Sequence, residues 1–282
     1  MACPCSGGAS KSSTPNPFKD YIPKHYTGAT PRQDVTARYA PTDYEQWNTG
    51  YDRMRAAEQL RLARLYKRVE AGVVIPCPDA VVIDDTVEIE TGATIYPGTV
   101  LRGNTHIGKA CIIGPNTTLD NVTVGDHCSL NNVVAEYAVV EDHCTVGPFV
   151  RLRSGAVISS KAKVGNFVEI KNSTIGECSK VAHLSYIGDT DMGGGCNVGC
   201  GFATANFDGF EKHRTTIGDG VFIGCDNTFV APVTIGDGAY TAAGSTITED
   251  VPAGALAFGR ARQVNLEGRA PTGASTDQQL AD

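Results

Sequence analysis

The sequence is poor in aromatic residues and contains no long apolar run. Phe, Trp and Tyr make up 7% of its 282 residues, whereas glycine occurs 32 times. Few large side chains and many glycines favour a β architecture with tight turns over a helical bundle. No stretch of about 18 apolar residues is present, so we expect no membrane-spanning helix. The N-terminal MACPCSGGASKSS lacks the apolar core of a secretory signal. We therefore expect a cytoplasmic protein, without a lipid anchor at Cys5.

Positive charge is also in short supply. The 24 Lys and Arg residues against 31 Asp and Glu give a net charge of −7, so neither nucleic acid nor an anionic membrane is an expected partner. The ten cysteines do not predict a disulfide framework, because no signal peptide accompanies them. Cys196 and Cys200 form only a CxxxC pair, and His183 and His213 are remote in sequence from that pair. We expect reduced, structural cysteines and no metal site.

Composition divides the chain into four parts. Residues 1–42 are rich in Gly, Ser, Thr and Pro without any period, which predicts a disordered N-terminal arm. Residues 43–72 form a linker helix region, since positions 51–70 are strong helix formers without Gly or Pro. Residues 73–268 form the main domain, and residues 269–282 are an expected disordered tail.

A six-residue period dominates the main domain. The periodic positions, almost all aliphatic, are Ile83, Ile89, Ile95, Leu101, Ile107, Ile113 and Leu119, then Val140, Val146, Leu152, Ile158, Val164 and Ile170, then Ile217, Ile223, Phe229, Ile235, Thr241 and Ile247. Between the first two series, the period slips by one at Val124 and Leu130. Neither a helix nor an ordinary strand has this period, which is typical of a hexapeptide β-helix. Three hexapeptides make a coil of about 18 residues, and coils stack about 4.8 Å apart. The period predicts an all-β parallel β-helix preceded by one α-helix, but no particular function.

The largest break in the period is residues 202–216, FATANFDGFEKHRTT. It is polar and charged, with a turn signal at Asp208 and Gly209. Such a loop suits a substrate wall or a contact with a neighbouring subunit, although a tolerated surface insertion stays open.

Four sequence blocks carry a more specific resemblance: VGPFVRLRSG, VGNFVEIKNSTIGECSKVAHLSYIGD, NVGCGFATANFDGFEKHRTTIGD and FIGCDNTFVAPVTIGDGAYTAAGSTIT. They resemble the acetyltransferase half of the bifunctional bacterial N-acetylglucosamine-1-phosphate uridyltransferase/glucosamine-1-phosphate acetyltransferases. The resemblance covers about 52–268. It implies a left-handed β-helix, a homotrimer with sites between subunits, acetyl-CoA as co-substrate and glucosamine-1-phosphate as acceptor. The Gly-rich nucleotide loop of that family has no counterpart in residues 1–42, so we expect no uridyl transfer and a need for a separate uridyltransferase.

Arg153 and Lys171 are separated by one full coil within an unbroken series. Both should project from the same face, where two like charges at coil spacing repel unless an anion lies between them. Two solvated side chains splayed apart are the alternative. The resemblance implies that the pair binds the sugar phosphate.

The resemblance also implies roles for further polar residues. His183 matches the family's proton acceptor, and Glu169 matches a glutamate that supports it. A base is needed because a protonated amine cannot attack a thioester, and imidazole titrates near neutral pH. Tyr186 and Asn197 match sugar contacts, while Lys212 in the long loop adds charge near the phosphate, from its own or a neighbouring subunit. Ordinary surface roles remain the alternative for each.

The same resemblance implies a set of acetyl-CoA positions, namely Cys200, Asn206, Phe207, Cys225, Ala243 and Arg260. Asn206 is the candidate donor to the thioester oxyanion. An acyl-cysteine intermediate at Cys200 or Cys225 is an alternative to direct attack by the amine. Phe207 stands where the family usually has Tyr, and Arg269 stands where its tail commonly has Trp; both differences bear on binding of the acetyl donor.

Three other functions remain open. A γ-type carbonic anhydrase would need three histidines around one metal, with His127 and His143 as the first two. A related N-acetyltransferase would act on another amino sugar or sugar nucleotide. A non-catalytic trimeric scaffold would keep the fold without turnover.

Overall fold

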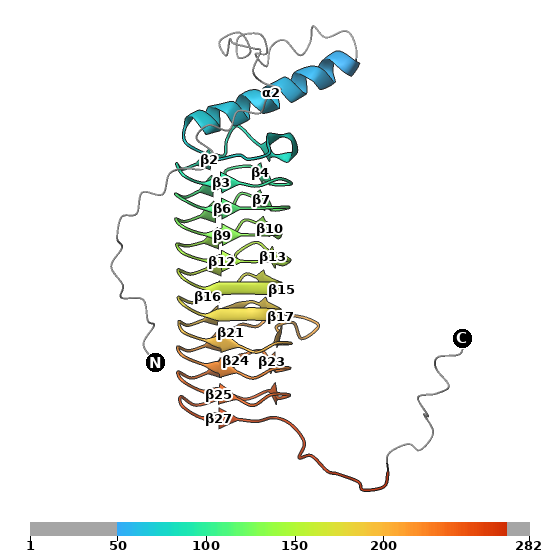
Figure 1. The fold of residues 1–282 in the computed structure, drawn as a ribbon. Coiled ribbons are helices and arrows are strands. Elements are labelled where there is room, and N and C mark those ends of the chain that lie inside the picture. The colour runs from blue at the N-terminus through green and yellow to red at the C-terminus, as the bar shows by residue number, and fades with distance from the viewer. Residues whose placement is uncertain (1–49, 270–282) are drawn as a thin grey trace, which may run out of the picture.

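The computed structural model describes residues 50–269. The expected arm over residues 1–42, and the expected tail beyond Arg269, lie outside the described residues. The described chain forms a left-handed parallel β-helix preceded by one α-helix, as the sequence predicts. Coils stack on one another in a long column, and the helix α2 (Gly50–Glu70) lies across its N-terminal end (Figure 1).

Each coil contributes short strands to three flat faces. Face 1 contains β1 (Val82–Ile83), β4 (Val100–Arg102), β7 (Thr118–Asp120), β10 (Val133–Glu136), β13 (Val150–Leu152), β20 (Ala203–Ala205), β23 (Thr228–Val230) and β26 (Thr246–Ile247). Face 2 contains β2 (Glu88–Ile89), β5 (His106–Ile107), β8 (Thr123–Val124), β11 (Val139–Val140), β14 (Val157–Ile158), β16 (Thr174–Ile175), β18 (Thr190–Met192), β21 (Thr215–Ile217) and β24 (Val233–Ile235). Face 3 contains β3 (Thr94–Ile95), β6 (Ile112–Ile113), β9 (Ser129–Leu130), β12 (Thr145–Val146), β19 (Asn197–Val198), β22 (Phe222–Ile223), β25 (Tyr240–Thr241) and β27 (Leu256–Ala257).

Two longer strands, β15 (Lys163–Lys171) and β17 (Lys180–Gly188), turn the corner from face 3 to face 1. They join these two faces into a single 18-stranded sheet, while face 2 remains a separate sheet of nine strands. The candidate site described below lies along this continuous corner.

The periodic aliphatic residues fill the inside of the column. Leu101, Ile107 and Ile113 are fully buried, and their counterparts in other coils pack above and below them. The slip in the period is accommodated by a shorter coil. Ile107 pairs directly with Val124, so this coil is one residue short of 18 and the aliphatic residue still points inward. The period therefore predicted the core correctly even where it shifts.

Three buried cysteines form a ladder at one corner. The backbone N–H of Cys128 donates to Sγ of Cys111, and that of Cys144 donates to Sγ of Cys128, both at 3.4 Å. In return, the thiol of Cys111 donates to the carbonyl of Gly125 at 2.9 Å. The hydrogen bond with Cys128 and burial together raise the pKa of Cys111, so this thiol stays neutral. These thiols satisfy backbone groups between coils, which is a structural role.

The open N-terminal end of the column is closed by α2. Arg68 is only 8% exposed, and its guanidinium donates to the carbonyls of Asp84 and Val87 at 3.0 Å each. Arg61 donates in the same way to the carbonyls of Pro78 and Val81. The first coil has no coil before it, so these arginines supply donors that a preceding coil would otherwise provide.

We expect Arg68→Met to destabilise the protein while keeping most of the apolar stem. The substitution leaves buried carbonyls without donors, which costs on the order of 1–3 kcal/mol. Urea unfolding followed by circular dichroism measures the change in midpoint. Arg53→Met is the matched control, because Arg53 lies exposed on the same helix. Equal midpoints for the two variants would show that α2 does not close the column through Arg68.

Candidate active site

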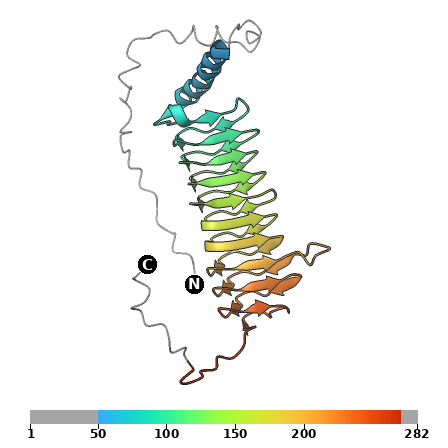
Figure 2. The same ribbon diagram turned by 90° about the vertical axis from the view of Figure 1, so that its right-hand side faces the viewer.

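The predicted catalytic and substrate residues lie along face 1 and the corners at its two edges, over the coils of β13, β15, β17 and β20. Parallel, in-register pairing places residues of successive coils directly above one another. The long loop between β20 and β21 projects from the column at this level (Figure 2). Residues far apart in sequence therefore meet on one outer surface.

Three cations converge on this surface. Leu152 pairs with Ile170, so Arg153 and Lys171, the next residue of each strand, lie side by side on adjacent coils. The ammonium of Lys212, from the loop, lies beside Lys171, which lowers the pKa of Lys212; nearby Arg153 adds to this effect. Lys212 reaches the pair from the same chain. The cluster is an electrostatic site for an anion, because an anion relieves the repulsion between neighbouring cations.

Two carboxylates hold these cations in place. Arg153 donates to Oε1 of Glu169 at 2.9 Å. Nζ of Lys171 lies 3.6 Å from Oδ2 of Asp189. The pair Arg153–Glu169 is about half-exposed, whereas the side chain of Asp189 is almost completely buried. Arg153–Glu169 is thus a hydrogen-bonded pair that solvent screens, whereas Lys171 lies beside a buried carboxylate.

Asp189 is a site residue that sequence reasoning missed. Its side chain accepts from Nδ2 of Asn172 at 2.6 Å and from Nδ2 of Asn206, so three coils are joined by an amide–carboxylate–amide ladder. Burial acts to raise the pKa of Asp189, but the hydrogen bonds from Asn172 and Asn206, with the charge of Lys171, outweigh it and lower that pKa. The three residues recur at intervals of 17, one short of the 18 that separates Arg153 and Lys171, so a constant 18-residue coil does not align them.

His183 lies exposed in the middle of β17, at the corner between faces 3 and 1. Its Nδ1 is 3.1 Å from Oδ1 of Asn166, its register partner in β15. An amide oxygen only accepts, so this contact assigns a proton to Nδ1, and in the neutral ring Nε2 then presents a lone pair. This is the tautomer in which Nε2 can accept a proton.

The expected contact between Glu169 and His183 is not found. Glu169 pairs in register with Tyr186 and bonds to Arg153, while His183 pairs with Asn166. The physical reason is the register, which places Glu169 three residues further along the strand than the partner of His183. In this chain, Asn166 orients the histidine ring.

The predicted acetyl-CoA positions extend from His183 down one column. Val181 pairs with Val198, and Tyr186 pairs with Ala203, which places Cys200 in register with His183. On the next two coils, the paired residues on either side of each position likewise place Cys225 over Cys200 and Ala243 over Cys225. The side chain of Arg260 ends the column, with its Cδ beside Gly244. Asn197 lies on face 3 instead, in β19, three residues before Cys200.

Tyr186 and Asn206 come together over Gly188. A Cβ at Gly188 would meet the hydroxyl of Tyr186 at 2.5 Å and Nδ2 of Asn206 at 2.8 Å. The glycine therefore leaves the space in which these two side chains lie. Asn206 is buried and already donates to Asp189, whereas Phe207, the next residue, is exposed. The two loop residues that the sequence predicted to contact acetyl-CoA therefore differ in exposure: Asn206 is buried and Phe207 faces solvent.

The loop itself is closed by its own hydrogen bonds. Asp208 accepts from the backbone N–H groups of Glu211 and Phe210, and from Nε2 of His213 at 2.8 Å. These bonds, led by that from Glu211, hold the pKa of Asp208 well below its usual range. The N–H of His213 donates to the carbonyl of Asn206 at 2.9 Å. A closed loop gives Lys212 a defined position beside Lys171.

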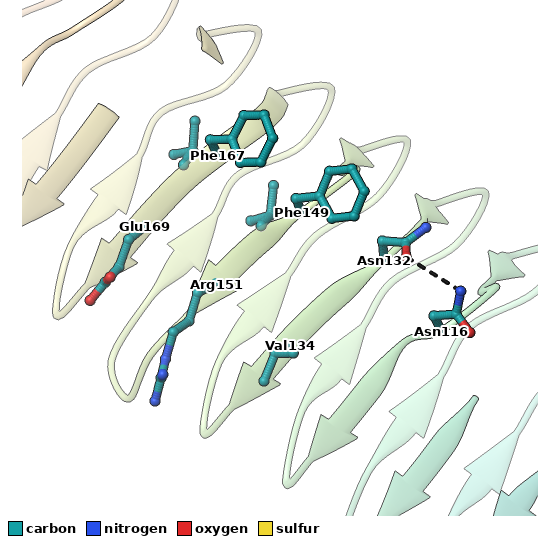
Figure 3. A pocket seen from close by; sticks show the side chains of 9 residues that line it. Asn116, Asn132, Val134, Phe149, Arg151, Phe167 and Glu169 are labelled. Atoms are coloured by element: carbon teal, nitrogen blue, oxygen red, sulfur yellow. Dashed lines mark hydrogen bonds between the residues drawn. The ribbon is translucent and has the colours of Figure 1, made fainter. Parts of the chain in front are cut away.

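A shallow hollow adjoins the cation cluster on face 1 (Figure 3). Arg151 and Glu169 line one side, and the stacked rings of Phe149 and Phe167 line the other, with centroids 5.4 Å apart. Phe149, Phe167 and Leu184 occupy one corner column and are 57–58% exposed. This apolar corner column, Phe149–Phe167–Leu184, runs alongside the candidate site.

The remaining histidines do not assemble with His183. The rings of His127 and His143 stack with centroids 5.0 Å apart, at the corner between faces 2 and 3. Within residues 50–269, no three His, Cys, Asp or Glu residues are grouped so that they could hold a metal ion. A three-histidine carbonic anhydrase site therefore has no support in this part of the chain. No helix within the same range is long and apolar enough to cross a membrane.

Known proteins match the chain over most of its length. Residues 77–164 match the model of the GMPPB C-terminal domain, and residues 214–249 match that of the bacterial transferase hexapeptide (six repeats). The bifunctional protein GlmU of Brevibacillus brevis is 46% identical over 194 residues, covering 69% of this chain and 42% of that protein. GlmU of Thermotoga maritima is 47% identical over 211 residues, covering 75% of this chain and 47% of that protein.

Among solved structures, UDP-N-acetylglucosamine O-acyltransferase (LpxA) from Moraxella catarrhalis matches with a TM-score of 0.45 and 18% identity, over 64% of this chain and 70% of that chain. The chain spans about half the length of the curated relatives that it matches. The hexapeptide repeat and the GlmU relatives show that the chain is an acyltransferase of the hexapeptide family, similar to the C-terminal, acetyltransferase half of GlmU.

Proposed function

We propose that the chain is an N-acetyltransferase that transfers the acetyl group of acetyl-CoA to the amine of glucosamine-1-phosphate. The observation that carries the proposal is the convergence of Arg153, Lys171 and Lys212 at one edge of face 1, on the coils whose opposite corner carries His183, with its Nδ1 beside Asn166. An acceptor with a phosphate next to an amine matches both features. Arg153 can bind two phosphate oxygens at once, and the lysines add point charges.

The reaction follows from the two ends of this site. Nε2 of His183 takes one proton from the neutral acceptor amine as the amine nitrogen forms a bond to the thioester carbonyl carbon. The carbon–sulfur bond breaks, the sulfur leaves with CoA, and the proton on His183 passes to that sulfur. Direct attack needs no acyl-cysteine, and the thiols of Cys200 and Cys225 then serve only to line the donor column. The product is N-acetylglucosamine-1-phosphate, a substrate for uridyl transfer.

Donor binding is assigned to the column below His183. Small side chains at Cys200, Cys225 and Ala243 leave room for a pantetheine arm along the stacked coils, and exposed Arg260 is available to a CoA phosphate. Asn206 has one side-chain N–H committed to Asp189, and its second N–H is the proposed donor to the thioester oxyanion. Tyr186 and Asn197 are the proposed sugar contacts.

A homotrimer with sites between subunits is part of the proposal. The apolar corner column Phe149–Phe167–Leu184 is exposed in the single chain, and Phe210 at the loop tip is 92% exposed. Apolar surface of this kind beside a polar site is typical of a protein interface. Packing of neighbouring subunits on this corner would cover the rings and exclude water from the site.

The product decides the proposal directly. We expect the purified chain with acetyl-CoA to add one acetyl group, detected by mass, to glucosamine-1-phosphate but not to glucosamine-6-phosphate or UDP-glucosamine. Mass detection avoids the background that ten cysteines give with thiol dyes. Acetylation of another acceptor would replace the acceptor assignment, and a well-folded trimer that acetylates none of them would favour the scaffold.

His183→Ala should lower turnover by about 10²–10⁴-fold, because the amine then loses its general base. The oligomeric state, measured by light scattering, should not change. His106→Ala is the control, since His106 is a partly exposed histidine on face 2, away from the site. Turnover of His183→Ala close to that of the control would remove His183 as the base.

Asp189→Asn should reduce the loss of unfolding free energy that the protein shows when the pH is lowered. The folded pKa of Asp189 is lowered, so the stabilisation from its carboxylate is complete above the unfolded value of about 3.9 and is lost as pH falls through the folded value. The variant is therefore less stable at pH 6 but loses less on acidification to pH 3. Urea midpoints at both pH values measure this, with the exposed Asp79→Asn as control. Equal acid losses for variant and wild type would contradict the assigned ion pair.

A further inference from the structure

Two thiols outside the buried ladder stand directly above one another on successive coils. Val198 pairs with Ile223 and Ala203 pairs with Thr228, with the same offset, which places Cys225 over Cys200. Cys200 is half-buried and Cys225 is exposed, so both side chains lie on the outside of the column. In-register parallel pairing also makes these side chains point the same way.

The two coils keep their normal separation at this point, although the long loop leaves the column a few residues later. The N–H of Asp226 donates to the carbonyl of Cys200 at 2.7 Å, and the N–H of Gly244 donates to the carbonyl of Cys225 at 2.8 Å. A Cβ built on Gly199 would lie 2.5 Å from the backbone nitrogen of Cys225. The backbones are therefore in close contact, and neither side chain can move far toward the other.

This spacing disfavours a disulfide and suits a bridging cation. Stacked strands lie about 4.7–4.9 Å apart, whereas a disulfide needs its Cβ atoms at about 3.5–4.5 Å. A metal–thiolate bond is about 2.3 Å long, so a linear S–M–S unit spans roughly 4.6 Å. That length fits between the two sulfurs without moving the coils.

The ligand set selects the class of cation. Zinc takes four ligands, and residues 50–269 offer no cluster of three or more metal-binding side chains at any point. Soft thiolates bind monovalent copper, zinc and iron–sulfur clusters, and of these only the monovalent ion is satisfied by two ligands. Ala243 follows Cys225 and His183 precedes Cys200 in this row of stacked residues, and within residues 50–269 no three such side chains are grouped so that they could hold a metal ion together. A two-coordinate site for a soft monovalent cation is what these residues can build.

We propose that Cys200 and Cys225 form a two-coordinate thiolate site for a soft monovalent cation, of the class of Cu(I) and Ag(I). Binding is balanced as two thiols and one M⁺ giving an anionic S–M–S bridge and two released protons, with no change of oxidation state. A constant coil length does not predict this pairing, because the two cysteines are 25 positions apart and the coil between them carries the long loop.

The site has a consequence for catalysis, which rests on the proposed function. His183 and Ala243 flank the two cysteines in the same column. A cation held there would occupy the position assigned to the acetyl donor and would exclude its thioester. The pair would thus couple acetyl transfer to the supply of soft cations.

Silver(I) tests the site, because it is redox-inert under these conditions. The full chain carrying Cys3→Ser, Cys5→Ser and Cys77→Ser serves as the reference protein, so that cysteines of the N-terminal segment and the exposed Cys77 do not compete. We expect native mass spectrometry, with glutathione as competitor, to find one silver per chain. Adding Cys200→Ser or Cys225→Ser should weaken silver binding at least 100-fold.

Cys178→Ser in the same background is the matched control. Cys178 lies half-buried at a different corner of the β-helix, and its register neighbours are Lys161 and Gly195 rather than cysteines. This variant should bind silver as the reference does. Unchanged silver binding in both Cys200→Ser and Cys225→Ser would overturn the site, as would equal loss in the control.

Measuring the rate of acetyl transfer with and without silver distinguishes the cation site from its proposed effect on catalysis. Each protein is compared with its own silver-free rate, and only those with both thiols should be inhibited. Silver bound at the pair without inhibition would overturn the coupling and leave the cation site standing. Absence of acetyl transfer in silver-free reference protein would count against the proposed function, while the silver stoichiometry would still decide the site.

Discussion

Backbone hydrogen bonding between successive coils is the constraint on which the rest of the structure depends. Each coil donates to and accepts from its neighbours, so a residue stands directly above its counterpart one coil away. Side chains on the outside are thereby repeated at about 4.8 Å, whatever their charge or size. Like residues must share that spacing or find partners, and this single requirement explains the cysteine ladder, the stacked rings and the cation cluster. The end of the stack, where no coil precedes, needs Arg61 and Arg68 instead.

The cation cluster shows how stacking produces a site. Arg153, Lys171 and Lys212 would repel one another as isolated neighbours, and Glu169 and Asp189 offset part of that repulsion. Because Asp189 is buried and bonded to two amides, Lys171 is oriented before any ligand arrives. Preorganisation of this kind is what stabilises developing charge in an active site, since the cost of arranging the groups is met on folding. The loop contributes by closing on itself through Asp208, so that Lys212 is also positioned.

The cysteines form two groups, which differ in whether the side chain points into the β-helix or out of it. Cys111, Cys128 and Cys144 point into a corner, bond to backbone groups and are shielded from reagents. Cys200 and Cys225 are stacked in the same way but lie outside the column, in line with His183. The same spacing that makes the first set inert places the second set at the separation of a linear thiolate bridge. Chemistry thus depends on which side of the chain a repeated residue faces.

The sequence by itself determined the coil and its contents, because a six-residue aliphatic period leaves only one way to bury every sixth side chain. It also placed Arg153 beside Lys171, since they are one coil apart in an unbroken series. It could not determine the partner of His183, because the coil there is 17 residues long and a constant period of 18 would pair the histidine with Gly165; only the register showed Asn166 beside it. Asp189 and the Cys200–Cys225 pair likewise appeared only in the tertiary structure, where a shortened coil and a looped-out coil fix contacts that a constant period of 18 would misplace.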